Sequence, residues 1–248
     1  MTDIPIRPAS TLIILRNLAS EPQVLMGQRG SKAAFMPNKF VFPGGAVDTA
    51  DSTIVLAQPL TNKCHARLQQ DSTGPKPETL AIAAIRELWE ETGLILGVRE
   101  PWNDAPKDWR GFADAGFRPT AKNMYFFFRA ITPPGPPRRF DARFFLVNAD
   151  QLSGDLDDFS NASDELSHLQ WVSLAEARSL NLPFITSVVL GELSGLNEIN
   201  APISVPFFKN QDEESLFDAI SSSESLKRIG AWYELHDANG NALGSKFQ

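Results

Sequence analysis

The sequence has little that would tie it to an oxidising compartment or to a membrane. Its single cysteine, Cys64, cannot form a disulfide within the chain. The first residues contain no apolar segment typical of a secretory signal, and the longest apolar runs, such as 144–147, are far too short to cross a bilayer. We therefore expect a soluble, cytoplasmic protein.

The sequence also lacks an excess of basic residues. Lysine and arginine number 23 against 30 acidic residues, which gives a formal net charge of -7 at pH 7. This balance argues against nucleic acid or an anionic membrane as the main partner, although a local basic patch fits within an acidic whole. At 248 residues and 42% hydrophobic content, the chain is long enough for one large core or two small ones.

Short apolar runs bounded by turn residues predict strands, and longer periodic segments predict helices. We expect a hairpin from 11–16 and 24–28, strands at 40–42, 123–131, 142–147 and 169–172, and a C-terminal hairpin from 232–235 and the residues after 242, turned at 237–241. Helices are expected from the cap Ser173 through Leu180 and at 184–193. Residues 49–77 and 100–116 predict loops, the first with at most a short helix at 64–70.

Residues 78–92 have the spacing of a helix, with Gly93 as its C-terminal stop. At about 100° per residue, apolar residues fall on one face, whereas Glu87, Glu90 and Glu91 fall within a narrow arc on the other. Carboxylates at this spacing repel one another near a helix end that is already negative, and a hard divalent cation relieves that repulsion. A solvated acidic helix face is the alternative that the spacing alone leaves open.

The residues around this acidic turn resemble the Nudix box, G-x5-E-x7-R-E-U-x-E-E-x-G-U, in which U is aliphatic. Residues 78–94 contain the second half of the box, and Phe-Pro-Gly-Gly at 42–45 resembles the Pro-Gly-Gly motif of the first half. Where the family has five residues between the glycine and the first glutamate, this chain has residues 46–77. We interpret residues 49–77 as an insertion that splits the box.

The resemblance implies roles for the matching residues. Glu87, Glu90 and Glu91 match the metal ligands, and Gly44 matches the glycine whose main-chain carbonyl joins them, with Mg²⁺, or Mn²⁺ in its place, as the cofactor. Glycine suits that position because a turn without Cβ lets a main-chain oxygen approach an ion closely. Arg86 and Glu78 match the pair of residues that braces the glycine motif against the helix. Gly45 and Gly93 match the other bracing positions of the box.

In the family reaction, an activated water attacks phosphorus while metal ions offset the developing negative charge. Arg86, Glu90 and Glu91 belong to the implied catalytic group. The general base varies within the family, and Glu91 and Glu165 are the two candidates here. Glu165 lies in a stretch, 164–172, that resembles the acidic loop before the family's Trp-Val strand, and an exposed loop acid is the alternative for it.

The stretch 139–145, together with the split box, resembles the branch of the family that contains the peroxisomal coenzyme A diphosphatase. Arg29 stands thirteen residues before Phe42, where that branch has an arginine, while Ala34 and Asn38 replace a second arginine and a glycine of its signature.

Arg29, Arg139 and Arg143 are the candidates for substrate binding, because guanidinium groups hold phosphates through paired hydrogen bonds. Arg143 alternates with Phe144 along a predicted strand, which slightly favours a solvent-facing position for it.

The resemblance implies an α/β fold, the Nudix α/β/α sandwich with a mixed sheet between helices. We expect it to span residues 1–195, with 49–77 as a lid or specificity loop and 196–248 as an extension packed on the same domain. The implied activity is metal-dependent hydrolysis of a diphosphate linkage in a nucleoside diphosphate joined to another moiety, such as coenzyme A or acyl-CoA. An ADP-ribose or dinucleotide diphosphatase and a non-catalytic nucleotide-binding module are the alternatives. The expected partner is a small diphosphate, with no nucleic acid or membrane, and a homodimer is compatible with the resemblance.

Overall fold

A mixed β-sheet with helices on both faces forms the centre of the computed structural model, which describes residues 4–211, 214–220, 225–229, 232–236 and 242–247. The strands of this sheet are β1 (Ile6–Arg16), β2 (Gln23–Arg29), β3 (Phe40–Val41), β4 (Gly44–Ala46), β7 (Tyr125–Ile131), β8 (Arg139–Asn148), β9 (Leu166–Ser173), β10 (Val205–Gln211), β11 (Glu214–Ile220), β12 (Ser225–Ile229), β13 (Trp232–His236) and β14 (Ala242–Phe247). A separate two-stranded sheet contains β5 (Gly97–Arg99) and β6 (Phe117–Pro119).

The helices are α1 (Asn62–Gln69), α2 (Pro77–Thr92), α3 (Arg110–Asp114), α4 (Leu174–Ala177) and α5 (Phe184–Leu193), with 3₁₀ turns η1 (Thr49–Thr53), η2 (Lys107–Trp109) and η3 (Ala149–Gln151). The main sheet has the order β14-β13-β12-β11-β10-β7-β8-β1-β2-β3, with β4 paired to β1 and β9 paired to β2. The β1–β8 and β7–β10 pairs are parallel, and the other described pairs are antiparallel, so the sheet is mixed as expected.

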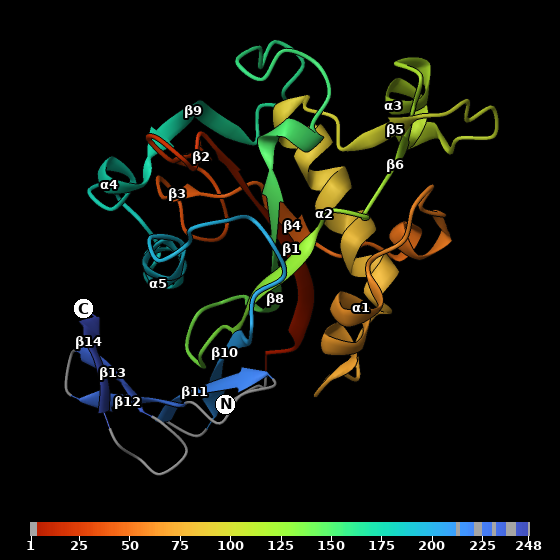
Figure 1. Cartoon of the computed structure of the whole chain (residues 1–248). Coiled ribbons are helices and arrows are strands. Elements are labelled where there is room, and N and C mark those ends of the chain that lie inside the picture. Colours follow the sequence, from red (N-terminus) through yellow and green to blue (C-terminus); the bar gives the residue numbers. More distant parts are fainter. Residues whose placement is uncertain (1–3, 212–213, 221–224, 230–231, 237–241, 248) are drawn as a thin grey trace.

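The two faces of the sheet support two separate hydrophobic cores. Because side chains alternate along a strand, Leu12 and Ile14 of β1 pack with α2, whereas Ile13 and Leu15 pack with α5 on the opposite face. Figure 1 shows α1 and α2 on one side of β1 and β8, and α4 and α5 on the other. The predicted α/β/α sandwich is therefore confirmed.

Helix α2 has the boundaries that its sequence dictates. Pro77 occupies the first helical position, where a missing N–H costs nothing, and Gly93 ends the helix with φ 75°, a left-handed conformation that favours glycine. The apolar residues of the predicted inner face, including Ile82, Ile85 and Leu88, are fully buried against the sheet. The helix consequently presents its last turn at a fixed place relative to β1 and β4.

Strand β1 changes its antiparallel neighbour halfway along. Its residues 9–11 pair with β4, while Leu15 and Arg16 pair with β2. The sequence predicted that Pro43-Gly44-Gly45 only ends a strand at 40–42, and this was wrong, because Gly44–Ala46 forms a short strand of its own. A three-residue strand has no periodicity to reveal it, and it places the two glycines beside β1 and under α2.

The insertion is packed on the core rather than lying open as a lid. Ile54, Leu60, Cys64 and Leu68 are buried in the same cluster as the inner face of α2. Arg67 of α1 donates hydrogen bonds to the carbonyls of Pro202 and Ile203 and so ties the insertion to the segment before β10. The short helix expected at 64–70 is confirmed as α1, and η1 is an element that the sequence did not predict.

Other predictions were wrong in extent. Residues 100–116 were expected to be a loop, but they contain η2 and α3, which lie between β5 and β6 along the chain. The helix capped by Ser173 ends at Ala177 instead of Leu180, because the chain turns there before Pro183 starts α5. Strands β13 and β14 pair as the predicted C-terminal hairpin, while its turn at 237–241 lies outside the described residues.

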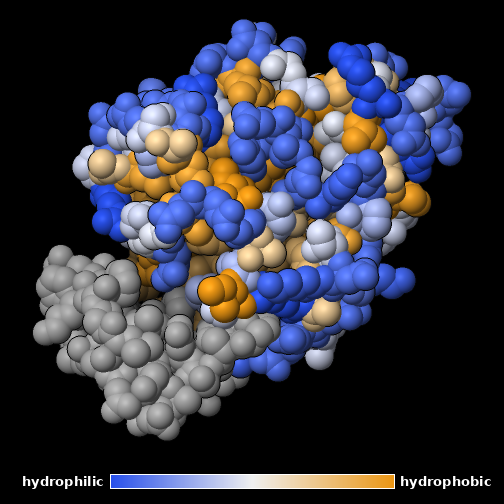
Figure 2. Space-filling model, in the orientation of Figure 1, coloured by the Kyte–Doolittle hydropathy of each residue, from blue (hydrophilic) through white to orange (hydrophobic). Residues whose placement is uncertain are grey.

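Hydrophilic residues cover most of the face shown in Figure 2, and hydrophobic residues gather between the region of α4 and α5 and the middle of the molecule. Among the residues that the structure describes, no helix combines the length and the hydropathy that crossing a membrane would require.

Candidate active site

The acidic turn of α2 lies against Gly44 and Gly45 of β4. The backbone N–H of Gly44 donates to Oε2 of Glu91 at 2.7 Å, and a Cβ on Gly45 would collide with the Glu87 carboxylate. Glu91 is 2% exposed and Glu87 is 8% exposed, whereas the Glu90 side chain is 42% exposed. A solvated acidic face is therefore the wrong description of Glu87 and Glu91.

Arg86 lies at the centre of this carboxylate group. Its Nε and Nη2 donate to the two carboxylate oxygens of Asp51 at 2.8 and 3.1 Å, and its Nη1 donates to Glu87 and Glu90, each at 2.9 Å. Nη2 also donates to the carbonyl of Ala46 at 3.0 Å. This one guanidinium therefore connects η1, β4 and the acidic turn.

The partner of Arg86 corrects the sequence prediction. Glu78 was expected to brace Arg86, but its carboxylate pairs with His65 at 3.2 Å, while Asp51, 1% exposed, makes the bidentate pair with Arg86. The spacing was a signal that sequence reasoning missed, because five residues separate Gly45 from Asp51, as in the box. The insertion thus follows the first acidic position of the box instead of preceding it.

Burial dominates the electrostatics of the acidic turn. It raises the pKa of Glu87 to about 7 and raises that of Glu91 well above its ordinary value, with the neighbouring Glu87 adding to the effect on Glu91. The pKa of Glu90 is raised by burial too, although Arg86 opposes the shift. For Arg86, burial lowers the pKa, but Asp51, Glu87 and Glu90 outweigh it and raise the pKa overall. The turn carries more buried negative charge than Arg86 alone neutralises.

Two residues named from the sequence lie near this turn. The backbone N–H of Ser163 donates to the Glu90 carbonyl at 2.9 Å, so the loop that carries Glu165 lies against the end of α2. The charge of Glu165 contributes to the raised pKa of Glu87, Glu90 and Glu91. Arg29 ends β2 opposite Leu166, the neighbour of Glu165, and its charge lowers the pKa of Glu91. Glu165 is exposed, and Arg29 is half-buried.

Arg139 and Arg143 lie on β8, which β1 separates from β4 in the sheet. The Nε of Arg139 donates to the Thr132 carbonyl at 3.1 Å. The prediction that Arg143 faces solvent was wrong, because Arg143 is 1% exposed, pairs with Asp141 at 2.8 Å and donates to Ser72 of the insertion at 3.1 Å. Burial lowers its pKa to about 10 although Asp141 opposes the shift. The insertion covers this face of β8, which strand alternation alone could not reveal.

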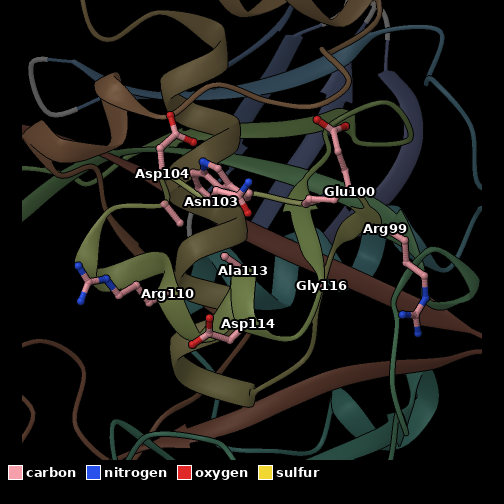
Figure 3. A pocket seen from close by; sticks show the side chains of 11 residues that line it. Arg99, Glu100, Asn103, Asp104, Arg110, Ala113, Asp114 and Gly116 are labelled. Carbon is pink, nitrogen blue, oxygen red and sulfur yellow. The ribbon is translucent and has the colours of Figure 1, made fainter.

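A cavity of about 860 Å³ lies elsewhere, in the segment 99–116 (Figure 3). Figure 3 shows Asn103 and Asp104 on one side of it and Asp114 on another. Its lining includes none of the candidate site residues. It is therefore a feature of the β5–α3 excursion and not of the acidic turn.

The acidic turn fits a divalent cation by its chemistry. Within the described ranges, no three histidine, cysteine or acidic side chains converge closely enough to hold a metal ion as they stand. The carboxylates of Glu87 and Glu90 face Arg86, and that of Glu91 faces Gly44. However, the available donors are all oxygen atoms, which is the donor set that Mg²⁺ prefers. An added positive charge would also stabilise the ionised forms of the buried Glu87 and Glu91.

Comparisons with known proteins agree with this geometry. The NUDIX domain family matches residues 74–189. The chain is 29% identical to nudix hydrolase 7 of Caenorhabditis elegans over 62% of this chain and 48% of that protein. It is 31% identical to the acyl-coenzyme A diphosphatase NUDT19 of Xenopus laevis over 36% of this chain and 29% of that protein. The chain thus spans about half or less of the length of these curated relatives.

A solved structure gives the same result for the fold. The crystal structure of a NUDIX hydrolase from Alicyclobacillus acidocaldarius superposes with a TM-score of 0.56 and 26% identity, and the match covers 76% of this chain and 90% of that one. The family match includes the whole acidic turn of α2. Residues 74–189 of the chain therefore match the NUDIX domain family, and the fold is that of a Nudix hydrolase.

Proposed function

We propose that the protein hydrolyses a diphosphate linkage in a nucleoside diphosphate joined to a second moiety, with coenzyme A or acyl-CoA as the first candidate substrate. The observation that carries the proposal is the buried group of Glu87 and Glu91 on one helical turn, held against Gly44 and Gly45. The description of the Xenopus laevis relative as an acyl-coenzyme A diphosphatase supports the choice of first candidate.

In this proposal, Glu87, Glu90, Glu91 and the carbonyl of Gly44 hold Mg²⁺. The bound cation supplies positive charge that offsets the negative charge developing on the reacting phosphate. Asp51 fixes the guanidinium of Arg86 through two hydrogen bonds, and Arg86 in turn orients the carboxylates of Glu87 and Glu90. Arg29 lies at the end of β2, where its guanidinium binds a substrate phosphate.

We assign the general base to Glu165 in preference to Glu91. Glu91 is buried, and its Oε2 already accepts the Gly44 N–H, whereas Glu165 is exposed beside the same turn. Its carboxylate takes a proton from the attacking water. Glu165→Gln is expected to lower kcat by about 100-fold or more, with an unchanged affinity for the metal. An unchanged kcat would return the role to Glu91.

The test is identification of products by mass spectrometry after incubation with Mg²⁺ and a panel of coenzyme A, acetyl-CoA, ADP-ribose and a dinucleotide. Release of 3′,5′-ADP from the coenzyme A compounds is the expected outcome. Release of AMP from ADP-ribose alone would assign the chain to the second substrate class. Binding of nucleotides without any product would indicate a non-catalytic module and refute the proposal.

A matched pair of variants checks the assignment of the metal ligands. Glu91→Gln is expected to abolish Mg²⁺-dependent turnover by orders of magnitude with the fold retained. Glu192→Gln, on the distant helix α5, provides the control, since it removes one carboxylate without touching the acidic turn. Equal activity of the two variants would refute the assignment.

A further inference from the structure

Two neighbouring strands beside the acidic turn carry buried polar atoms that have no hydrogen-bond partner in the part of the chain that the structure describes. These atoms are Oγ of Ser10 on β1 and Nε of Arg143 on β8. Ser10 is 0% exposed and Arg143 is 1% exposed. A buried polar atom without a partner is costly, so its presence next to a site indicates a partner that forms in another state of that site.

The strand registers place Ser10 directly beside the glycine that meets Glu87. Ser10 is the antiparallel partner of Gly45 on β4 and the parallel partner of Arg143 on β8. Paired residues point to the same face of a sheet, and Leu12, two residues after Ser10, packs with α2 on that face. Ser10 therefore lies in a row of three paired residues under α2, between Gly45 and Arg143.

This row brings the Ser10 hydroxyl within reach of the Glu87 carboxylate. A Cβ on Gly45 would collide with that carboxylate, so the carboxylate lies where a side chain of Gly45 would be. The Cβ atoms of directly paired residues are about 4.5–5.5 Å apart, a gap that a hydroxyl spans by a hydrogen bond or through one water molecule. Oε1 of Glu87 accepts from Arg86 at 2.9 Å, and Oε2 is the second acceptor of the same group.

The guanidinium of Arg143 is held in place from its other side. Its Nη1 pairs with Asp141 at 2.8 Å, and its Nη2 donates to Oγ of Ser72 in the insertion at 3.1 Å. Asp141 is itself fixed by two hydrogen bonds from Arg129, at 2.9 and 2.8 Å. Arg143 cannot turn away from the row without losing these contacts, so its Nε stays beside Ser10.

We propose that Ser10 is a positioning residue for Glu87: in the metal-bound protein its hydroxyl accepts a hydrogen bond from Nε of Arg143 and donates one to the Glu87 carboxylate. This inference rests on the proposed function, because it takes Glu87 as a ligand of Mg²⁺. A hydroxyl suits the place between the two groups, since it both accepts and donates, whereas a guanidinium only donates and a carboxylate only accepts. The contacts from Ser72 through Arg143 and Ser10 then connect the insertion to the metal ligands.

The test is calorimetric titration of the intact protein with Mg²⁺ alone, together with urea unfolding in EDTA. Ser10→Ala is expected to weaken the binding of Mg²⁺ by about tenfold, because a ligating carboxylate loses the hydrogen bond that orients it. Its stability in EDTA is expected to equal or slightly exceed that of the wild type, since the lost hydroxyl has no partner without the metal. Ser72→Ala is expected to weaken Mg²⁺ binding less, and to add nothing in the Ser10→Ala background, because both act through the same contacts.

Thr186→Val is the matched control for Ser10→Ala, because Thr186 is a hydroxyl residue 3% exposed on α5, at the opposite face of the sheet. Thr73→Ala is the control for Ser72→Ala, because Thr73 is its exposed neighbour in the insertion. Both controls are expected to bind Mg²⁺ like the wild type. An unchanged affinity in Ser10→Ala would overturn the inference, and so would a matching loss of stability in EDTA, which would indicate a structural role. Binding of Mg²⁺ without any product in the substrate panel would instead count against the proposed function.

Discussion

Arg86 connects the two parts of the site, which are the η1–β4 segment and the acidic turn of α2. Its guanidinium is nine-tenths buried and faces three carboxylates, one from η1 and two from its own helix. A buried cation that loses its principal partner is costly, because the hydrogen bonds that this partner accepted are then made neither to water nor to another carboxylate. The contact with Asp51 therefore matters more for the site than the exposed charges around it.

Asp51→Asn is expected to reduce the affinity for Mg²⁺ and the activity by about 10- to 100-fold, because the guanidinium then no longer fixes Glu87 and Glu90. Glu78→Gln, at the position that the sequence alone favoured, should have little effect, since Glu78 pairs with the half-exposed His65. Titration of Mg²⁺ binding and kcat measurements check both variants. A larger loss in Glu78→Gln than in Asp51→Asn would contradict the assignment.

Gly45 is a second position where a single atom decides the geometry. Gly45→Ala is expected to lower activity by about 100-fold while the protein stays folded, because the added Cβ displaces the Glu87 carboxylate. Gly74→Ala is the control, since the nearest heavy atom to its added Cβ would be the Ser72 Oγ at 3.9 Å. Kinetics and circular dichroism of the two variants, measured together, distinguish a displaced side chain from a general loss of structure.

Among the elements, α1 shows that the insertion has a structural role. Leu68 of α1 is 2% exposed and packs in the same core as Ile82 and Ile85 of α2. Any change that removes α1 exposes the flank of the helix that carries the acidic turn. Deletion of residues 52–74 is consequently expected to lower the stability of the protein, whatever its effect on substrate preference.

Leu68→Ala is expected to lower the free energy of unfolding by about 2–5 kcal/mol, through the lost burial and the cavity that remains. Val55→Ala, in the same insertion but 64% exposed, should change it by less than about 0.5 kcal/mol. Urea denaturation of both variants measures the difference. Similar small effects would show that the insertion is only loosely attached to the core.

The elements also show what the sequence can and cannot predict. Helix α2 was predictable because its apolar period, Pro77 and Gly93 all indicate the same boundaries. Strand β4 and helix α3 were not, since three to five residues contain too little periodicity. The Asp51–Arg86 pair and the burial of Arg143 both depend on where the insertion packs, and that is a long-range property.

At the scale of the whole molecule, the buried carboxylates make stability depend on pH. The pKa of Glu87 in the folded protein is about 7, against an ordinary value of 4.5, and those of Glu90 and Glu91 are raised too. Between these two pH values, the folded protein binds more protons than the unfolded chain. The free energy of unfolding of the metal-free protein must therefore decrease as pH rises from 4.5 to 7.

This decrease is expected to be on the order of 1–3 kcal/mol for Glu87. The measurement is the difference between the urea unfolding profiles of wild type and Glu87→Gln across this pH range, which isolates the one carboxyl group. Added Mg²⁺ should stabilise the wild type above pH 7 and the variant much less. Parallel profiles for the two proteins would show that the Glu87 carboxyl does not titrate there.

The position of Asp51 before the insertion has a consequence for how the chain tolerates change. Gly45 and Asp51, which meet Glu87 and Arg86 from outside α2, both precede residue 52. The five-residue spacing between them therefore does not depend on the length of the segment that follows. We expect changes of length and engineered grafts to be tolerated between Ser52 and Lys76, provided that the substitute refills the space that α1 occupies beside α2. By contrast, we expect gain or loss of a residue within 44–51 to disrupt the contact between Asp51 and Arg86.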